Sequence, residues 1–195
     1  MSTRQIALAA VLLAIVFLAH AAGRFTQIGG AQLAPSIAIY VLMALLIAPE
    51  LGWGPLVGIG LATGILTMLA TSSPFPPANI PAHGLAFLAA AYLTKLWVKD
   101  REASTGQIVA IAAVTLVVSW TLFALFTWLG LAGSPFTARA FARFGMAFGQ
   151  GFTAWWLFGF VGVAIPTFIV ALILTPLLYR VVRPALVRQG MLAVA

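Results

Sequence analysis

The sequence predicts an all-α integral membrane protein, a single compact bundle of six transmembrane helices over residues 1–195 with both termini in the cytoplasm. Of the 195 residues, 63% are hydrophobic and only 7% are charged, whereas about 25% are charged in an ordinary soluble domain. The apolar residues form runs of roughly the 20 residues that a helix needs to cross a bilayer. Charged side chains lie at or beyond the ends of these runs. A soluble domain and a disordered chain are therefore excluded.

Each helix is predicted from its own segment. The six spans are 5–22, 33–48, 53–70, 81–98, 107–131 and 152–182. The first resembles a signal peptide, with Arg4 before the apolar run and Ala19-His20-Ala21 after it. Its apolar run is long for such a peptide, so we expect a retained helix. The second span begins near Pro35 and ends at a turn containing Glu50 and Gly52.

The later spans carry small residues and prolines with predictable effects. The third contains Gly58-x-Gly60-x-x-x-Gly64, a stripe that lets a neighbouring helix approach closely. The segment 71–81 holds four prolines and cannot form one straight helix. A charged turn separates the fourth and fifth spans. The sixth span is longer than a bilayer requires, and Pro166 and Pro176 predict kinks within it.

The basic residues predict the orientation. Six spans place both termini on one side, and seven Lys and Arg residues fall on that side: Arg4, Lys95, Lys99, Arg101, Arg180, Arg183 and Arg188. Three fall on the other side: Arg24, Arg139 and Arg143. The positive-inside rule then assigns the termini to the cytoplasm. The net charge of +7 is read as a topology signal in a lipid bilayer, so no nucleic-acid partner is expected.

The sequence offers little for catalysis or metal binding. It contains no cysteine, and no Asp lies inside a predicted span. The two histidines, His20 and His83, fall near the outer ends of the first and fourth spans, and two imidazoles without carboxylates make a poor metal site. We therefore expect no enzyme, no metal and no cofactor. Because both histidines lie at one depth, they can line one outward-facing cavity; the alternative is that each is an interfacial or hydrogen-bonded histidine.

The uncharged loop 70–81 is the most informative candidate for binding. Irregular backbone at membrane depth is tolerated mainly where it lines a cavity. Asn79 offers a donor and an acceptor, and Phe75 offers a stacking face. Trp120, in the middle of the fifth span, either faces a ligand or packs. A plain proline-rich turn remains the alternative for the loop. Without a charge deep in a span, coupling to an ion gradient is not expected.

Several short motifs lie between residues 60 and 87. They are Gly60-Leu61-Ala62-Thr63-Gly64-Ile65, Leu69-Ala70-Thr71, Phe75-Pro76-x-x-Asn79-Ile80-Pro81 and Ala86-Phe87. With six spans and this length, the chain resembles the substrate-binding S components of energy-coupling factor (ECF) transporters, and within them the tryptophan transport protein family. The resemblance implies capture of a small organic nutrient, with tryptophan the best candidate, at a prokaryotic plasma membrane. It also implies delivery through a transmembrane coupling protein driven by two ATPase subunits.

The resemblance further implies roles for particular residues. The first helix of such proteins docks through small residues, which here are Ala7, Ala10 and Ala14. The loops after the first, third and fifth spans enclose the substrate. That enclosure, together with the residue chemistry above, gives the substrate-binding candidates Arg24, Phe75, Asn79, His83, Trp120, Arg139 and Arg143.

One departure leaves the ligand open. Where the tryptophan family has an acidic–basic pair after the Ile-Pro of the outer loop, this chain has Ala82-His83-Gly84. An arginine can bind a ligand carboxylate, but no outward-facing acid is predicted to bind an ammonium group. A vitamin or vitamin precursor (biotin, a thiamin-related compound or a corrinoid) is therefore an alternative ligand. A membrane scaffold without a ligand is an alternative of another class.

Overall fold

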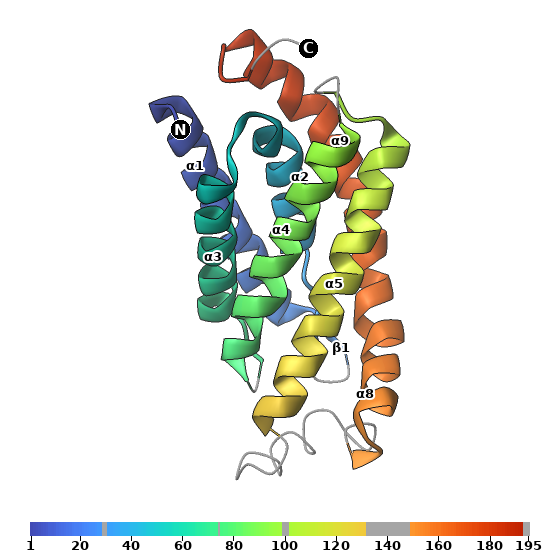
Figure 1. Ribbon diagram of the computed structural model, residues 1–195. Helices are drawn as coiled ribbons and strands as arrows, with labels where there is room; N and C mark the ends of the chain where they lie inside the picture. The colour runs from blue at the N-terminus through green and yellow to red at the C-terminus, as the bar shows by residue number, and fades with distance from the viewer. Residues whose placement is uncertain (29–30, 74, 99–101, 132–148, 193–195) are drawn as a thin grey trace.

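Helices make up nearly all of the computed structural model, which describes residues 1–28, 31–73, 75–98, 102–131 and 149–192 (Figure 1). The α-helices are α1 (Thr3–Ala22), α2 (Ser36–Ile47), α3 (Trp53–Ala70), α4 (Asn79–Trp97), α5 (Thr105–Leu131), α8 (Phe152–Gly159) and α9 (Ile165–Arg188). Shorter helical turns are η1 (Gly23–Phe25), η2 (Ala48–Glu50), η3 (Pro76–Ala78) and the π-helical η4 (Phe160–Ala164). The two-residue strands β1 (Gln27–Ile28) and β2 (Ala31–Gln32) pair antiparallel. The predicted all-helical class is confirmed.

Four helices of the described chain are long and apolar enough to cross a membrane. They are Thr3–Phe25, Trp53–Ala70, Thr105–Leu131 and Phe152–Arg188. By length and composition they are the helices of a multi-pass membrane protein. The second and fourth predicted spans are also helical, as α2 and α4, but they are not among these four. The described residues thus support four candidate spans where the sequence predicts six.

The two remaining helices differ from a typical span for separate reasons. The short apolar helix Ser36–Glu50 is about 22 Å long at 1.5 Å per residue, against roughly 30 Å of hydrocarbon. It begins at Ser36, with Pro35 as its N-cap residue, three residues later than the predicted span. Helix α4 is long enough, but Asn79, His83 and Lys95 make it less apolar.

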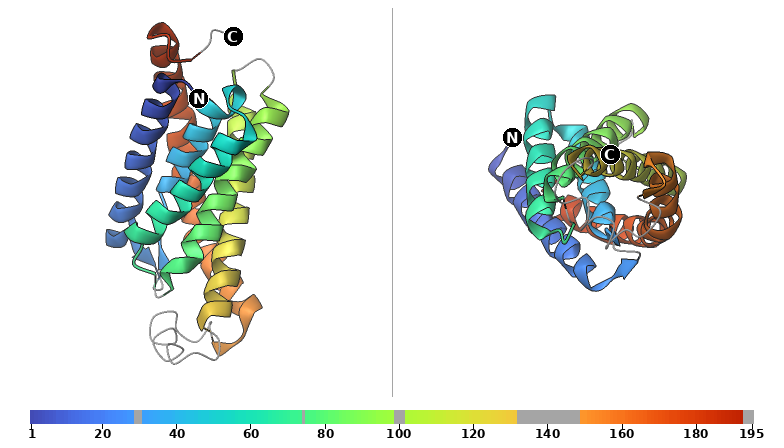
Figure 2. Two further views of the ribbon diagram at one scale, coloured as in Figure 1. Left: turned by 60° about the vertical axis from the view of Figure 1, so that its left-hand side comes forward. Right: turned by 90° about the horizontal axis from the view of Figure 1, so that it is seen from below.

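Helix α2 forms the centre of the bundle. Every residue of α2 except Ile39 is buried, and the helix packs against α1, α4, α5 and α9. Figure 2 shows the other helices around it in the view along the bundle. A helix that is hydrophobic on all sides is stable only when other elements cover it completely. The predominantly apolar composition of α2 therefore explains its central position.

Helices α3 and α4 approach each other closely at glycines. A Cβ atom built on Gly60 would lie 3.1 Å from the Gly84 carbonyl oxygen, and one on Gly84 would lie 3.0 Å from the Gly60 oxygen. A Cβ atom on Gly64 would overlap the backbone of Ile80, at 2.8 Å from its Cα. The close approach that the glycine stripe predicts is thus observed at Gly60 and Gly64. Gly58 is exposed, with nothing within 4 Å of its added Cβ.

The last helical segment contains an irregular turn where the sequence predicts a disturbance. Helix α8 continues through η4 into α9, and Pro166 is the second residue of α9, one residue after Ile165. Proline lacks an N–H group and cannot continue the regular hydrogen-bond pattern, and π-turns commonly accommodate such defects. Pro176 and Pro184 lie inside α9.

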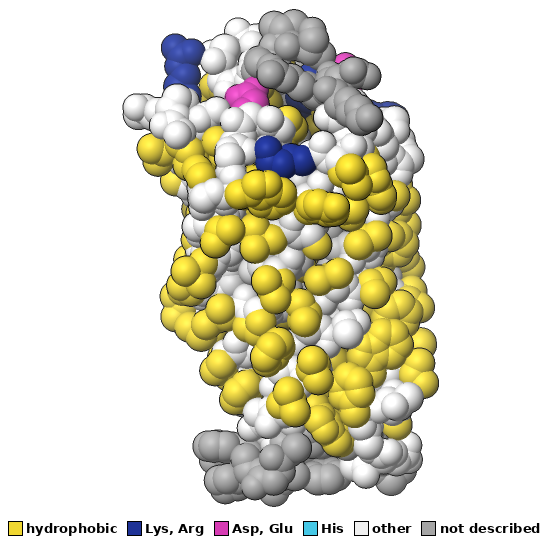
Figure 3. All heavy atoms as spheres, in the orientation of Figure 1, with side chains coloured by type: hydrophobic (Ala, Val, Ile, Leu, Met, Phe, Trp, Pro, Cys, Tyr) yellow, Lys and Arg dark blue, Asp and Glu magenta, His cyan; other side chains and the backbone are white. Residues whose placement is uncertain are grey.

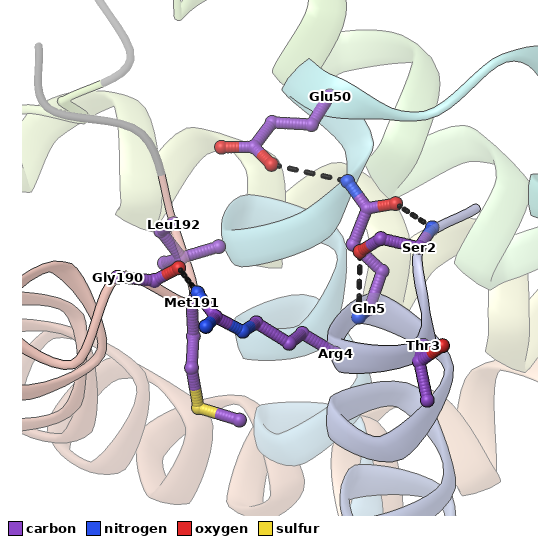
Figure 4. A pocket seen from close by; sticks show the side chains of 8 residues that line it. All are labelled: Ser2, Thr3, Arg4, Gln5, Glu50, Gly190, Met191 and Leu192. Atoms are coloured by element: carbon purple, nitrogen blue, oxygen red, sulfur yellow. Dashed lines mark hydrogen bonds between the residues drawn. The ribbon is translucent and has the colours of Figure 1, made fainter.

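The two ends of the described chain meet at one end of the bundle. Arg4 Nη1 donates a hydrogen bond to the Gly190 carbonyl at 3.0 Å, and Gln5 Nε2 donates to Glu50 Oε2 at 3.2 Å. These side chains border an open hollow of about 550 Å³ (Figure 4). Ser2 and Gln5 also form a capping box that begins α1. The first and last residues that the structure describes therefore lie at the same end of the bundle.

The outer surface is divided between an apolar middle and a polar end. Hydrophobic side chains cover the middle of the face in Figure 3, and charged side chains gather at the end where α1 begins. Leu18, Leu129, Val161 and Val181 are each more than half exposed. Large exposed apolar patches on a soluble protein are unusual, so this surface matches the lipid-facing surface of a membrane protein.

Candidate functional site

A buried cluster of uncharged polar side chains lies inside the apolar bundle. Four helices contribute to it: His20 comes from α1, Ser36 and Tyr40 from α2, His83 from α4 and Ser119 from α5. All five side chains are at most 4% exposed. We call this group the histidine cluster. Buried polar groups in a bundle of this kind are costly unless they are hydrogen-bonded, and they commonly mark functional sites.

Short contacts connect the members of the histidine cluster. His20 Nδ1 lies 2.9 Å from Ser36 Oγ. His83 Nδ1 lies 3.2 Å from Ser119 Oγ and 3.4 Å from the Tyr40 hydroxyl. The two imidazole rings meet edge to face, with centroids 4.9 Å apart. The structure thus brings together the two histidines that the sequence places at one depth.

Asn79 lies one helical turn before His83, at the start of α4. The Asn79 side chain is 1% exposed, and its Nδ2 donates to the Pro76 carbonyl at 2.9 Å. Residues four apart lie on the same face of a helix, so Asn79 and His83 occupy one face of α4. The hydrogen bond from the Asn79 side chain holds the turn η3 against the start of α4.

Arg24 has a structural role in this fold. Its Nε donates to the Ala70 carbonyl at 2.6 Å, and its Nη2 lies 3.2 Å and 3.4 Å from the carbonyl oxygens of Leu69 and Thr71. The last carbonyls of a helix have no partner within the helix, and a cation there also interacts favourably with the helix dipole. The guanidinium of Arg24 therefore caps α3. Its predicted contact with a ligand remains a prediction.

We expect Arg24→Gln to lower the free energy of unfolding by about 1 kcal/mol, because a charge-assisted cap of α3 is lost. Thermal unfolding in detergent measures this change. Arg188→Gln, an exposed arginine at the end of α9, is the control and should have little effect. A loss of ligand affinity with unchanged stability would instead assign Arg24 to the binding site.

Phe75 and Trp120 both pack against glycines. A Cβ on Gly130 of α5 would lie 2.7 Å from Phe75 Cε2, so the half-buried phenyl ring rests on the α5 backbone. The Trp120 indole likewise fills the space beside Gly159 of α8. Each glycine permits an aromatic side chain to contact the helix backbone. Phe75 thus attaches the proline-rich loop to α5.

Trp120 connects α5 to the start of the last helical segment. Its Nε1 donates to the Trp156 carbonyl at 3.1 Å, and Trp156 Nε1 donates to Thr121 Oγ1 at 3.2 Å. The Trp120 ring also packs against Phe123 and Trp155. Trp120 was predicted either to face a ligand or to pack, and these contacts are packing contacts between helices.

The remaining predicted residues lie on the surface or outside the described part. Ala7, Ala10 and Ala14 are exposed along the outer face of α1. Arg139 and Arg143 fall outside the described residues, so the structure places neither. The docking role of Ala7, Ala10 and Ala14 stays a prediction.

Three members of the histidine cluster were not predicted from the sequence. Ser36, Tyr40 and Ser119 are polar residues within long apolar runs. Ser36 and Tyr40 are four apart and therefore share one face of α2. Polar residues with helical spacing in an otherwise apolar span are the signal that could have identified them. Within the residues that the structure covers, no three His, Asp or Glu side chains gather as a metal site would require.

Comparisons with protein-family models, with curated proteins and with solved structures find no match for this chain. The resemblance to S components therefore stays a prediction from the sequence. The histidine cluster and the apolar bundle around it are the structural basis for inferring a function.

Proposed function

We propose that the chain is the membrane-embedded, substrate-binding S component of an ECF-type importer. It captures a small organic nutrient, with tryptophan the best candidate, and passes it to a coupling protein driven by two ATPase subunits. The histidine cluster carries this proposal. Five buried, uncharged hydrogen-bonding side chains from four helices supply donors and acceptors for an organic molecule. In an apolar bundle such groups are expensive, which favours a binding role over simple packing.

The orientation in the membrane belongs to the same proposal. The chain crosses a prokaryotic plasma membrane six times, with α2 and α4 completing the four longer spans. The ends of the chain face the cytoplasm, because Arg4, Arg180, Arg183 and Arg188 lie at that end of their helices. The loop before Asn79 then faces the outside of the cell, and the histidine cluster lies in the interior of the bundle, in the half nearer that loop. A ligand from outside reaches the cluster by passing this loop.

The distribution of charge favours a binder that depends on another protein for energy. In the described helices, the Lys and Arg side chains lie in the first or last turns or near the end of α9. Ion-coupled transporters commonly use ionisable groups at the middle of the membrane. The histidine cluster contains no carboxylate, ammonium or guanidinium group. An ATP-driven partner docking on α1 would supply the energy.

Tryptophan fits the chemistry of the cluster in part. Imidazole nitrogens and hydroxyl oxygens can accept the indole N–H, and the hydroxyls can donate to a carboxylate. No member of the cluster carries the negative charge that an ammonium group prefers. An uncharged heterocycle, as in several vitamin precursors, therefore suits the cluster as well as an amino acid does. This is the specific observation that keeps a vitamin-related ligand as the second candidate.

Native mass spectrometry of the purified protein, followed by calorimetric titration with tryptophan, tests the proposal. We expect a dissociation constant near or below about 1 μM, or roughly −8 kcal/mol. Tyr40→Phe should weaken binding about tenfold, because one hydroxyl of the cluster is lost. The matched control is Tyr179→Phe, which removes a buried hydroxyl that binds the Ala103 amide at 2.9 Å.

The outcomes separate the candidate functions. A co-purified molecule of a different mass would change the identity of the proposed ligand but would still support the proposed transporter class. Equal changes in the dissociation constant for Tyr40→Phe and Tyr179→Phe would show that the histidine cluster is not the binding site. Absence of both a bound mass and binding heat would favour a scaffold protein.

A further inference from the structure

A basic hollow lies between the start of α5 and the last turns of α9. It has a volume of about 440 Å³ and includes Thr105, Arg180 and Arg183 in its lining. It is at the same end of the bundle as the chain termini, where α5 and α9 are in contact (Figure 1). The hydroxyl of Tyr179 accepts the Ala103 amide N–H at 2.9 Å and so holds the chain before α5 against α9. The hollow is therefore a fixed feature of the junction between two helices.

Two guanidinium groups give the hollow its charge. Arg180 Nη2 donates to Thr105 Oγ1 at 2.7 Å, which holds this arginine at the rim. The Arg183 side chain is only 11% exposed, and its Nη1 lies 4.0 Å from Glu102 Oε2. Among the described residues that line the hollow, Glu102 is the only acid, and its side chain is 68% exposed. The hollow is thus lined by two guanidinium groups, an exposed one from Arg180 and a mostly buried one from Arg183, and by one exposed carboxylate.

Arginine pairs of this kind suit phosphate. The planar guanidinium presents several N–H donors in a fork that matches phosphate oxygens. A phosphodiester carries a single negative charge, which equals the net positive charge of Arg180, Arg183 and Glu102 together. The side chain of Thr105 adds a hydroxyl at the same rim. Basic pockets between membrane helices commonly bind lipid headgroups in this way.

An apolar stripe continues from the hollow along α9. Leu177 is 57% exposed and Ile173 is 62% exposed. They precede Arg180 by three and seven residues, so the three side chains share one face of α9. The surface therefore changes from basic to apolar along the axis of α9, from Arg180 toward Ile173. That sequence of chemistries matches a phospholipid, with its phosphate at the arginines and an acyl chain over Leu177 and Ile173.

We propose that this hollow is a binding site for an anionic phospholipid, whose phosphate contacts Arg180 and Arg183. The site is separate from the histidine cluster and does not depend on which nutrient the protein binds. It requires only that α5 and α9 lie in a bilayer. A bound lipid would hold the two helices together at this end of the bundle.

Native mass spectrometry of the full chain with added phosphatidylglycerol or phosphatidylcholine tests the proposal. We expect phosphatidylglycerol to bind at least about tenfold more tightly, because it lacks the choline cation. Arg180→Gln combined with Arg183→Gln should weaken phosphatidylglycerol binding at least about tenfold. Arg188→Gln, a nearby arginine outside the hollow, should leave that binding unchanged. Inorganic phosphate added to the wild type should displace little of the lipid.

Several results would overturn the proposal. Equal binding of the two lipids by the wild type would do so without any variant, even if the double variant fails to fold. An equal loss of binding in the Arg188→Gln control would show unspecific attraction to surface charge. Full displacement of lipid by millimolar inorganic phosphate would assign the hollow to the free anion instead.

Discussion

Replacing Gly64 with alanine is expected to destabilise the bundle by about 3 kcal/mol, near the upper end of the usual cost of overpacking. A Cβ atom at this position overlaps the backbone of Ile80, 2.8 Å from its Cα. Backbone atoms in the first turn of α4 cannot rotate away as a flexible side chain can. Helices α3 and α4 must therefore move apart, and the shift also disturbs Asn79 and His83 at the start of α4.

Gly58→Ala provides a matched control on the same helix. Gly58 is exposed, and its added Cβ has nothing within 4 Å. Alanine also has a higher helix propensity than glycine by about 1 kcal/mol in water, so this variant should be neutral or slightly stabilised. Thermal unfolding in detergent, followed by circular dichroism, compares the two variants. Equal unfolding temperatures for Gly64→Ala and the wild type would contradict the close contact.

The glycine stripe shows what a one-dimensional pattern can predict. The close approach of a neighbouring helix was predictable from three small residues in one span. Which of them face the neighbour follows from helical geometry, because Gly60 and Gly64 are four residues apart and share a face. Gly58 lies two residues before Gly60, on nearly the opposite side of the helix. The partner helix and its contact at Ile80 depend on the tertiary fold, which the spacing does not contain.

The central helix shows where a composition rule reaches its limit. The apolar run 33–48 predicts a span, and α2 is apolar on all sides. The same composition suits a buried core helix that does not need to cross the bilayer alone. Burial by four neighbours distinguishes these cases, and burial is a property of the whole bundle. Pro35 is the N-cap residue of α2, so the helix begins at Ser36 rather than at residue 33.

The candidate site was predictable only in part, for a similar reason. Asn79 and His83 stand out because they are polar residues at the point where a proline-rich loop leads into an apolar span. Tyr40 and Ser119 gain their importance from contact with His83, across 43 and 36 residues of sequence. The cap of α3 by Arg24 is likewise a long-range contact, made at the end of another helix. Such pairs are determined by packing rather than by local sequence.

The substitution Ala10→Trp or Ala14→Trp is expected to abolish nutrient uptake while leaving ligand binding intact. Both alanines are exposed on α1, in line with Ala7. Small residues allow the backbones of two membrane helices to approach closely, and in lipid this packing replaces the hydrophobic driving force. An indole on that face would hold a docking partner several ångströms away. Uptake should therefore fall to the level of cells that lack the chain.

The experiment measures uptake of labelled tryptophan by cells that contain the coupling protein and both ATPases, and binding by calorimetry. Binding should change by no more than about twofold, as for most surface substitutions. Val161→Trp is the control, because Val161 is 63% exposed on η4 and adds the same indole to another lipid-facing surface. Loss of uptake in this control as well would show a general effect of a bulky residue. Loss of binding in the α1 variants would show that the alanines support the site rather than a partner. Only an uptake defect confined to α1, with binding preserved, separates energy coupling from substrate recognition and identifies α1 as the docking helix.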